Sequence, residues 1–290
     1  MKMNFPQKFD LHMHTCVSDG TDTPEEIIGC VKKAGVTCFS VTDHDATKAC
    51  DRIQSAIKDD DHLFFVNGTE LSCRDEEGQY HVLGYRYDSQ SESIKGLIEK
   101  GHGFRMKKVT ARLDFIRTEF GFEFPEEEIN KLLSMDNPGK PHIGNLMVKY
   151  GYAETKEIAI REYINKLHVK KEYIRPEEAI EAILQGGGIP VLAHPCYGSG
   201  DQLILGEEME QRLKKLMGFG LLGVEAFYSG FSDKLRNAML SLAEKYNLYV
   251  TAGSDYHGKN KLVRLGDTGM DPAAEIPEGL RRFAQDAFEK

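Results

Sequence analysis

Short apolar runs alternate with amphipathic stretches in the first third of the chain, and the alternation returns after Pro176. The apolar runs predict seven strands, at residues 9–14, 36–43, 63–71, 80–87, 189–193, 222–227 and 248–252. The amphipathic stretches predict helices at residues 24–34, 47–58, 177–185, 207–217 and 233–247. Strands that alternate with helices in this way are typical of βα units around a largely parallel sheet. We therefore expect an α/β fold.

The helix predicted at residues 24–34 has clear signals at both ends. Thr23 is a suitable N-cap, Pro24 takes the first helical position, and Glu26 completes a capping box with Thr23. Gly35 predicts the end of the helix, because glycine readily adopts the left-handed conformation found there. Ser232 is a similar N-cap for the helix at residues 233–247. Short-range chemistry thus predicts these boundaries.

The middle of the chain has a different pattern. Strand signals disappear between residues 88 and 172, and helical stretches are interrupted at Gly121, Pro125, Pro138–Pro141 and Gly151. The simplest organisation is a β/α barrel or sheet built from residues 1–87 and 173–290. A mostly helical insertion domain of residues 88–172 would interrupt it and cap the substrate.

Charge divides along the same boundary. The 290 residues include 37 Lys and Arg against 46 Asp and Glu, a net charge of −9. Residues 88–172 hold 15 Lys and Arg against 14 Asp and Glu, so the insertion is at +1 and the remainder at −10. An acidic protein does not coat long nucleic acid or an anionic membrane, because both need a basic excess. A small anionic substrate requires local positive charge.

The six cysteines have no C-x-x-C spacing, which disfavours a disulfide framework or a thiolate zinc site. The N-terminal residues show no secretory signal, and no apolar stretch approaches the roughly 18 residues of a membrane span. We expect a cytoplasmic protein without a membrane anchor, and no obligate protein partner is evident.

Histidines and carboxylates gather where the predicted strands end. His12 and His14 lie two residues apart in the first strand, so their side chains share a face. The remaining candidates lie at or just beyond later strand ends, with His81 inside the fourth strand: Asp19, His44, Glu70, His81, His194, Asp255 and His257. In β/α barrels this rim carries the catalytic groups.

Imidazoles and carboxylates together are ligands for Zn, Mn or Fe, and six histidines with three carboxylates exceed the needs of one ion. Two or three metals that share a carboxylate could activate water for phosphate-ester hydrolysis. Taken singly, Asp19 is also a turn residue, Asp43 and Asp45 are also helix caps, and a lone histidine is usually structural. The complete set favours a metal site.

Five segments resemble the motifs of the polymerase and histidinol phosphatase (PHP) domain family. They are DLHMHTCVSDG (Asp10–Gly20), VTDHD (Val41–Asp45), GTEL (Gly68–Leu71), AHP (Ala193–Pro195) and GSDYH (Gly253–His257). The resemblance covers the chain outside the insertion, in the family's motif order. It implies a distorted seven-stranded β/α barrel, similar to a TIM barrel, with up to three metals at the C-terminal rim.

The resemblance also implies a ligand set. His12, His14, Glu70 and Asp255 would hold the first metal, and Glu70 would bridge to a second held by His81 and His194. Asp19, His44 and His257 would hold the third, while Asp43 and Asp45 would orient His44 or the backbone around it. Manganese is the first choice, with iron or zinc as alternatives.

Two segments of the insertion, GKPHIGNLMVKYGY (Gly139–Tyr152) and KKEYIRPEEAI (Lys170–Ile180), are similar to stand-alone PHP phosphoesterases acting on nucleotides. Those enzymes carry an arginine for the substrate phosphate where this chain has Lys140, which keeps the charge but loses the bidentate fork. Arg105, Lys171 and His142 are further candidates for substrate binding. His142 and His194 are candidates for proton transfer, and Tyr228 could stack on a base or belong to the core.

We therefore expect a metal-dependent phosphoesterase that releases phosphate from 3′,5′-bisphosphonucleotides or from mononucleotides such as AMP, by a metal-activated hydroxide. The alternatives are a 5′–3′ exonuclease on short RNA and a histidinol-phosphate phosphatase. A non-catalytic metal-binding module is disfavoured, because none of the nine expected ligand positions is vacant. Long nucleic acid is disfavoured because an insertion at +1 offers only a short basic groove.

Overall fold

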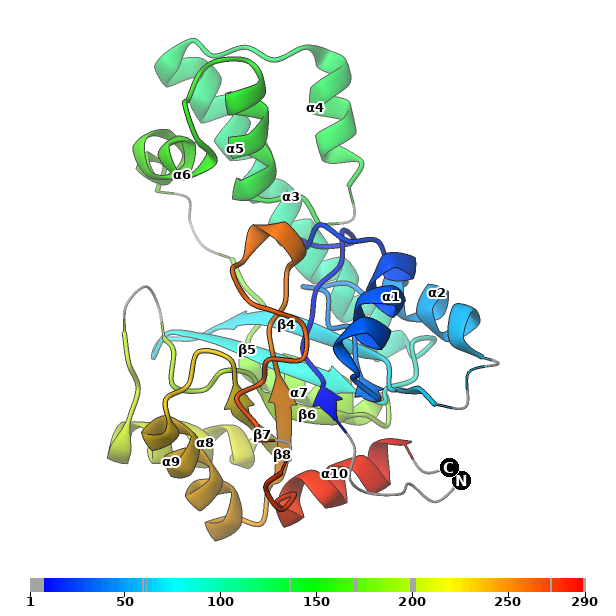
Figure 1. Cartoon of the computed structure of the whole chain (residues 1–290). Coiled ribbons are helices and arrows are strands. Elements are labelled where there is room, and N and C mark those ends of the chain that lie inside the picture. The colour runs from blue at the N-terminus through cyan, green and yellow to red at the C-terminus, as the bar shows by residue number, and fades with distance from the viewer. Residues whose placement is uncertain are drawn as a thin grey trace. The chain divides into compact units, whose positions relative to one another are not determined.

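The computed structural model describes residues 8–58, 60, 62–135, 137–168, 172–198, 202–271 and 273–288. The chain divides into two compact units (Figure 1). The first unit contains Met1–Ile98 and Ile174–Lys290, and the second contains Glu99–Tyr173. In the part of the chain that the structure describes, no helix has the length and apolar character needed to cross a membrane.

The first unit contains two β-sheets. A three-stranded parallel sheet has the order β1-β2-β3, formed by Phe9–Asp10, Cys38–Phe39 and Phe64–Phe65. A five-stranded sheet has the order β4-β5-β6-β7-β8, formed by Gly68–Arg74, Gln79–Tyr85, Ile189–Leu192, Gly223–Tyr228 and Tyr249–Gly253. Strands β4, β5 and β6 pair antiparallel, whereas β6, β7 and β8 pair parallel.

The α/β class is confirmed, but a closed seven-stranded barrel is not what the structure shows. The described residues form eight strands in two separate sheets. Residues 63–71, predicted to begin as a strand, contribute to two strands, β3 and β4, and between them the Asn67 side-chain amide donates to the main-chain oxygen of Tyr87 at 2.6 Å. Main-chain hydrogen bonds outside the named ladders connect the two sheets, among them Leu11 N to Ala252 O at 2.7 Å, Asp255 N to His12 O at 2.8 Å and Glu70 N to Asp43 O at 3.2 Å.

The predicted capping of the first helix, α1 (Pro24–Ala34), is confirmed. Thr23 Oγ1 accepts a hydrogen bond from Glu26 N at 3.2 Å, and the Glu26 carboxylate accepts one from Thr23 N at 2.8 Å. Gly35 ends the helix at a φ of 68°. The other long helices of this unit are α2 (Lys48–Ile57), α7 (Pro176–Gln185), α8 (Gly206–Gly218), α9 (Asp233–Lys245) and α10 (Glu278–Phe288). The apolar pattern did not predict α10, and a short 3₁₀ turn, η3 (Gly258–Asn260), follows β8.

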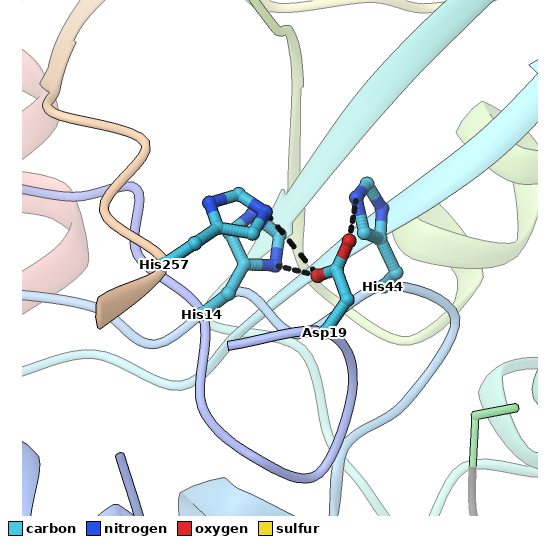
Figure 2. A group of neighbouring side chains, drawn as sticks. All are labelled: His14, Asp19, His44 and His257. Carbon is cyan, nitrogen blue, oxygen red and sulfur yellow. Dashed lines mark ion pairs between the residues drawn. The ribbon is translucent and has the colours of Figure 1, made fainter. Parts of the chain in front are cut away.

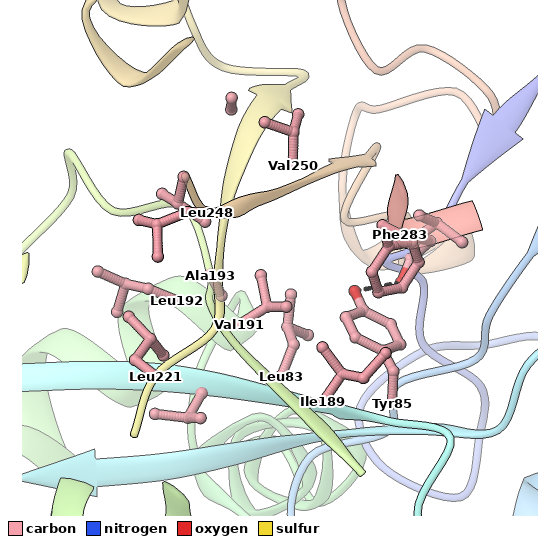
Figure 3. Close-up of a cluster of buried hydrophobic side chains, with 14 of the residues drawn as sticks. Leu83, Tyr85, Ile189, Val191, Leu192, Ala193, Leu221, Leu248, Val250 and Phe283 are labelled. Atoms are coloured by element: carbon pink, nitrogen blue, oxygen red, sulfur yellow. Dashed lines mark hydrogen bonds between the residues drawn. The ribbon is translucent and has the colours of Figure 1, made fainter. Parts of the chain in front are cut away.

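The larger apolar core of the first unit is formed by buried residues of the five-stranded sheet and its helices (Figure 3). Tyr85 of β5 is fully buried and meets Phe283 of α10 edge-on, with ring centroids 5.1 Å apart. The Tyr85 hydroxyl donates to the main-chain oxygen of Leu11 at 2.9 Å. This contact links the core to the segment that carries His12 and His14.

The second unit is helical, and its described residues contain no strand. Its elements are α3 (Glu92–Phe120), which begins in the first unit, α4 (Glu126–Leu133), α5 (Lys140–Lys149), α6 (Lys156–Ile158), a π-helical turn η1 (Ala159–Tyr163) and a 3₁₀ turn η2 (Ile164–Lys166). A separate apolar cluster that includes Val109, Ile116, Ile143 and Met147 stabilises these helices. Phe122 and Tyr152 stack with ring centroids 4.3 Å apart.

Candidate metal centre

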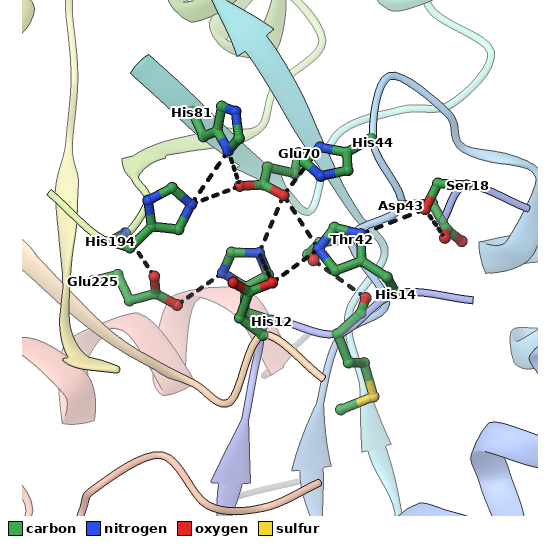
Figure 4. Close-up of polar contacts among 12 residues, drawn as sticks. His12, His14, Ser18, Thr42, Asp43, His44, Glu70, His81, His194 and Glu225 are labelled. Carbon is green, nitrogen blue, oxygen red and sulfur yellow. Dashed lines mark hydrogen bonds and ion pairs between the residues drawn. The ribbon is translucent and has the colours of Figure 1, made fainter. Parts of the chain in front are cut away.

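Glu70 is the centre of a cluster of five histidines (Figure 4). Strand β4 carries this carboxylate, whose side chain is 1% exposed. One oxygen, Oε2, lies 3.2 Å from His12 Nε2, from His14 Nε2 and from His44 Nδ1. The other oxygen, Oε1, lies 2.7 Å from His81 Nδ1 and 3.0 Å from His194 Nε2. A single buried carboxylate therefore contacts imidazoles from four different segments of the chain.

Asp255 adds a second carboxylate beside His12 and His14. Its Oδ1 lies 3.6 Å from His12 Nε2 and 3.4 Å from His14 Nε2. Asp255 follows β8 and adopts a φ of 57°, an uncommon value for a residue other than glycine. Its main-chain N–H donates to His12 O at 2.8 Å, so the backbone itself holds the loop after β8 against the segment after β1.

A third group surrounds Asp19 (Figure 2). Asp19 Oδ1 lies 3.2 Å from His257 Nε2 and 3.8 Å from His14 Nδ1, and Asp19 Oδ2 lies 4.0 Å from His44 Nε2. The ligand atoms of these four residues all lie within 4.8 Å of one another. Two further triads meet the same limit, His12 with His14 and Glu70, and His44 with Glu70 and His81. The structure thus brings the nine predicted ligand residues together in one unit.

Asp43 and Asp45 accept hydrogen bonds from residues close to the cluster. Asp43 Oδ1 accepts hydrogen bonds from Thr15 N at 2.8 Å and from Ser18 Oγ at 2.6 Å. Asp45 Oδ1 accepts one from Ser72 N at 2.9 Å. These bonds hold the loop after His14, and strand β4 beyond Glu70, in place around the cluster.

Three residues at the cluster were not predicted from the sequence to support the metal ligands. Glu225 of β7 accepts a hydrogen bond from His12 Nδ1 at 3.0 Å, and Lys261 forms an ion pair with Asp255 Oδ2. Tyr228 is buried and donates its hydroxyl proton to Asp255 Oδ2 at 2.8 Å, so it is a support for Asp255 rather than a base-stacking surface. The available signal for Glu225 was a single acidic residue inside an apolar strand, which needs a buried polar contact.

Burial and opposite charges shift the pKa values of the cluster strongly. Burial by itself raises the pKa of Glu70, but the charges of His44, His81 and His12 outweigh it and hold the pKa well below its ordinary range. Burial lowers the pKa of His14, yet the neighbouring carboxylates of Asp255 and Glu70 raise it to about 9. For His44, burial prevails and lowers the pKa to about 4. The cluster therefore favours bound positive charge, which protons or cations can supply.

The donor atoms fit divalent metal ions. The Nε2 atoms of His12 and His14 are buried and form no hydrogen bond of acceptable geometry with any described residue, although each faces the Glu70 carboxylate. A nitrogen lone pair aimed at a carboxylate oxygen is explained when a cation lies between them. The three described groups that meet the distance limit contain only imidazoles and carboxylates, a donor set that suits Mn, Fe or Zn.

Of the predicted substrate-binding residues, Lys140, His142 and Arg105 belong to the second unit, and Lys171 lies outside the described residues. Lys140 is half-buried at the start of α5, and its Nζ donates to Asn165 Oδ1 at 2.5 Å. His142 Nδ1 accepts a hydrogen bond from Gly139 N at 3.1 Å, and the His142 side chain lines a 260 Å³ pocket between α4 and α5. The Arg105 guanidinium lies beside Gly139.

The chain is similar to several known proteins. The PHP domain family matches residues 10–219 of the chain. The chain is 24% identical over 269 residues to a 5′-3′ exoribonuclease of Haemophilus influenzae, an alignment covering 90% of this chain and 93% of the relative. It is 26% identical over 258 residues to a 3′,5′-nucleoside bisphosphate phosphatase of Chromobacterium violaceum, with 86% of each chain covered.

A solved structure from Bifidobacterium adolescentis, assigned to the metal-dependent phosphoesterases, is also similar. It is 27% identical, covers 96% of both chains and superposes with a TM-score of 0.80. The family match covers most of the chain and includes Glu70, His81 and His194. The chain belongs to the PHP domain family, as a metal-dependent hydrolase of phosphate esters.

Proposed function

We propose that this chain hydrolyses phosphate monoesters of nucleotides, namely 3′,5′-bisphosphonucleotides and mononucleotides such as AMP. The proposal depends above all on Glu70, whose two carboxylate oxygens contact five imidazoles in a buried site. A site of this kind concentrates divalent charge, which the hydrolysis of an anionic ester requires. The nucleotide part of the proposal is supported by the Chromobacterium violaceum relative and by the cations of the second unit.

We assign the ligands to two or three divalent ions, with Mn²⁺ as the first candidate. His12, His14, Glu70 and Asp255 would hold the first ion, Glu70 with His81 and His194 the second, and Asp19, His44 and His257 the third. The close approach of each set in the structure supports this division. When bound, such ions supply Lewis-acid charge to phosphoryl oxygens and lower the pKa of water.

Substrate binding is assigned to Lys140, Arg105, Lys171 and His142. Lys140 offers an ammonium group, which binds a phosphate as a point charge and lacks the planar fork of arginine. The Arg105 guanidinium lies beside Gly139, the residue that directly precedes Lys140 at the start of α5. Helix starts favour anions because their first main-chain N–H groups point outward, so this region suits a phosphate group.

The proton for the leaving oxygen is assigned to His142 or His194, and the hydrogen bonds favour His142. Because His142 Nδ1 accepts a hydrogen bond from Gly139 N, its neutral form carries the ring proton on Nε2 and can donate it. His194 Nε2 instead faces Glu70 Oε1 at 3.0 Å, which suits a metal ligand.

A 5′–3′ exoribonuclease acting on short RNA is the second candidate. It is supported by the Haemophilus influenzae relative, whose 24% identity differs little from the 26% of the bisphosphate phosphatase. Both activities break a phosphate ester beside a nucleoside, so the same metal cluster serves either one. The two activities differ in how much of the substrate the protein must contact outside the metal cluster, because an exoribonuclease also binds the rest of the RNA.

The two candidates differ in their products. Metal-stripped protein with Mn²⁺ added back would be assayed on adenosine 3′,5′-bisphosphate, AMP, histidinol phosphate and a short 5′-phosphorylated RNA. We expect inorganic phosphate from the bisphosphate, with a kcat/KM at least about tenfold above that for the other substrates. Release of mononucleotides from RNA at the highest kcat/KM would favour the exoribonuclease. Full activity in chelator-treated protein would refute a metal-dependent reaction.

A further inference from the structure

Glu225 contacts two of the proposed metal ligands that also contact Glu70 (Figure 4). It is carried by β7 and is fully buried. Its Oε1 accepts a hydrogen bond from His12 Nδ1 at 3.0 Å, and its Oε2 accepts one from the main-chain N–H of His194 at 2.7 Å. His12 Nε2 and His194 Nε2 in turn face the two different oxygens of Glu70. His12 and His194 therefore each connect the two carboxylates.

The contact with His12 determines which ring nitrogen carries a proton. An ionised carboxylate only accepts hydrogen bonds, so His12 Nδ1 must be the donor. The neutral imidazole then presents the lone pair of Nε2 toward Glu70 Oε2 and Asp255 Oδ1, at 3.2 and 3.6 Å. This is the tautomer that a metal ligand at Nε2 requires.

The contact with His194 acts through the backbone. His194 has a φ of 26°, a conformation that is rarely adopted by residues other than glycine. The hydrogen bond from its N–H to Glu225 helps to maintain this conformation, which sets the direction in which the imidazole leaves the main chain. As a result, His194 Nε2 lies 3.0 Å from Glu70 Oε1 and 3.2 Å from His81 Nδ1.

Strand β8 leaves room for this arrangement at Gly253. A side chain at this position would overlap both Glu225 Oε1 and the Cβ atom of His12. The glycine thus allows a third strand to pass close to the contact between Glu225 and His12. The segment after β1, strand β7 and strand β8 therefore pack closely together around Glu225.

We propose that Glu225 is a positioning residue that couples the two metal positions sharing Glu70. It orients His12, assigned to the first ion, through the ring, and His194, assigned to the second, through the main chain. The proposal rests on the metal-dependent function proposed above. Glutamine at position 225 cannot reproduce both contacts, because its amide has one acceptor oxygen and both His12 Nδ1–H and His194 N–H are donors. A carboxylate that served only to stabilise the fold would not alter metal affinity selectively.

The test measures Mn²⁺ binding by isothermal titration calorimetry in the absence of substrate. Metal-stripped wild-type protein would be compared with Glu225→Gln and with the control variant Asp75→Asn. Asp75 is a buried carboxylate in the hairpin between β4 and β5; it accepts a hydrogen bond from Glu77 N and pairs with Lys215. We expect Glu225→Gln to weaken Mn²⁺ binding by about 10- to 100-fold at both sites, and Asp75→Asn to leave it unchanged. Thermal unfolding of the metal-free proteins separates this effect from a loss of fold.

Each result leads to a definite conclusion. Mn²⁺ affinities within about twofold of wild type in folded Glu225→Gln would overturn the proposal. An absence of Mn²⁺ binding in wild-type protein would instead refute the metal-dependent function on which the proposal rests. If Glu225→Gln does not fold, ¹⁵N NMR of wild-type protein loaded with diamagnetic Zn²⁺ would identify which ring nitrogen of His12 carries the proton. A protonated Nδ1 on His12 is expected, and a protonated Nε2 would overturn the proposal.

Discussion

The metal cluster of the first unit and the cations of the second unit differ in how their side chains are held. Glu70 and His12 are buried, and each contacts several other members of the cluster. Lys107 has a side chain that is 68% exposed and pairs with Glu172, and Lys140 is half-buried beside Asn165. A change in the cluster therefore disturbs several residues at once, whereas replacement of Lys107 affects one exposed ion pair.

The largest effect is expected from Glu70→Gln. The amide removes the charge that five imidazoles share, so we expect kcat/KM for the preferred substrate to fall on the order of 10³-fold, or about 4 kcal/mol. The matched control is Glu210→Gln, which removes a surface carboxylate that pairs with Lys214 and Lys245 in the same unit. Steady-state phosphate release with Mn²⁺ present measures both variants. If kcat/KM of Glu70→Gln stayed within tenfold of the wild-type value, Glu70 would not be essential to the reaction.

A core substitution in the helical unit tests how independent the two units are. Ile143 is fully buried in the cluster that stabilises this unit, so Ile143→Ala is expected to lower its free energy of unfolding by about 2–4 kcal/mol. Hydrogen exchange should increase in α4 and α5, while Mn²⁺ binding by the first unit stays unchanged. Val148→Ala, on the exposed side of α5, should change stability by less than about 0.5 kcal/mol. Weaker Mn²⁺ binding in Ile143→Ala would contradict the expectation that the two units are stabilised by independent apolar cores.

The smallest effect is expected at Lys140. Lys140→Ala should raise KM about tenfold, roughly 1.4 kcal/mol, with little change in kcat, because a cation away from the metal ligands contributes mainly to ground-state binding of the phosphate. Lys140→Arg should keep the affinity, since it retains the charge. Lys149→Ala, in the same helix, is the control because Lys149 pairs with Glu128. Equal KM values for Lys140→Ala and wild type would remove Lys140 from the substrate site.

Short-range patterns predicted the elements that depend on neighbouring residues. The capping box at Thr23 and Glu26 is an interaction over three residues, and it is present where expected. Residues 63–71 were predicted to begin as a strand, and they contribute to two, β3 and β4; Asn67 between them donates to Tyr87 O, a residue twenty positions away. Helix α10 also lay outside the prediction, although its buried face packs on β8.

The same distinction between local and long-range interactions applies to the candidate site. The sequence by itself predicts the α/β class, a mostly helical insertion and nine candidate imidazole and carboxylate ligands, because residue type and the ends of strands can be read from local order. Only the tertiary structure decided that eight strands form two sheets, and that Glu225, Tyr228 and Lys261 support the cluster. Glu225 is 213 residues from His12 along the chain, and a hydrogen bond across that separation exists only after β7 and the segment after β1 have come together.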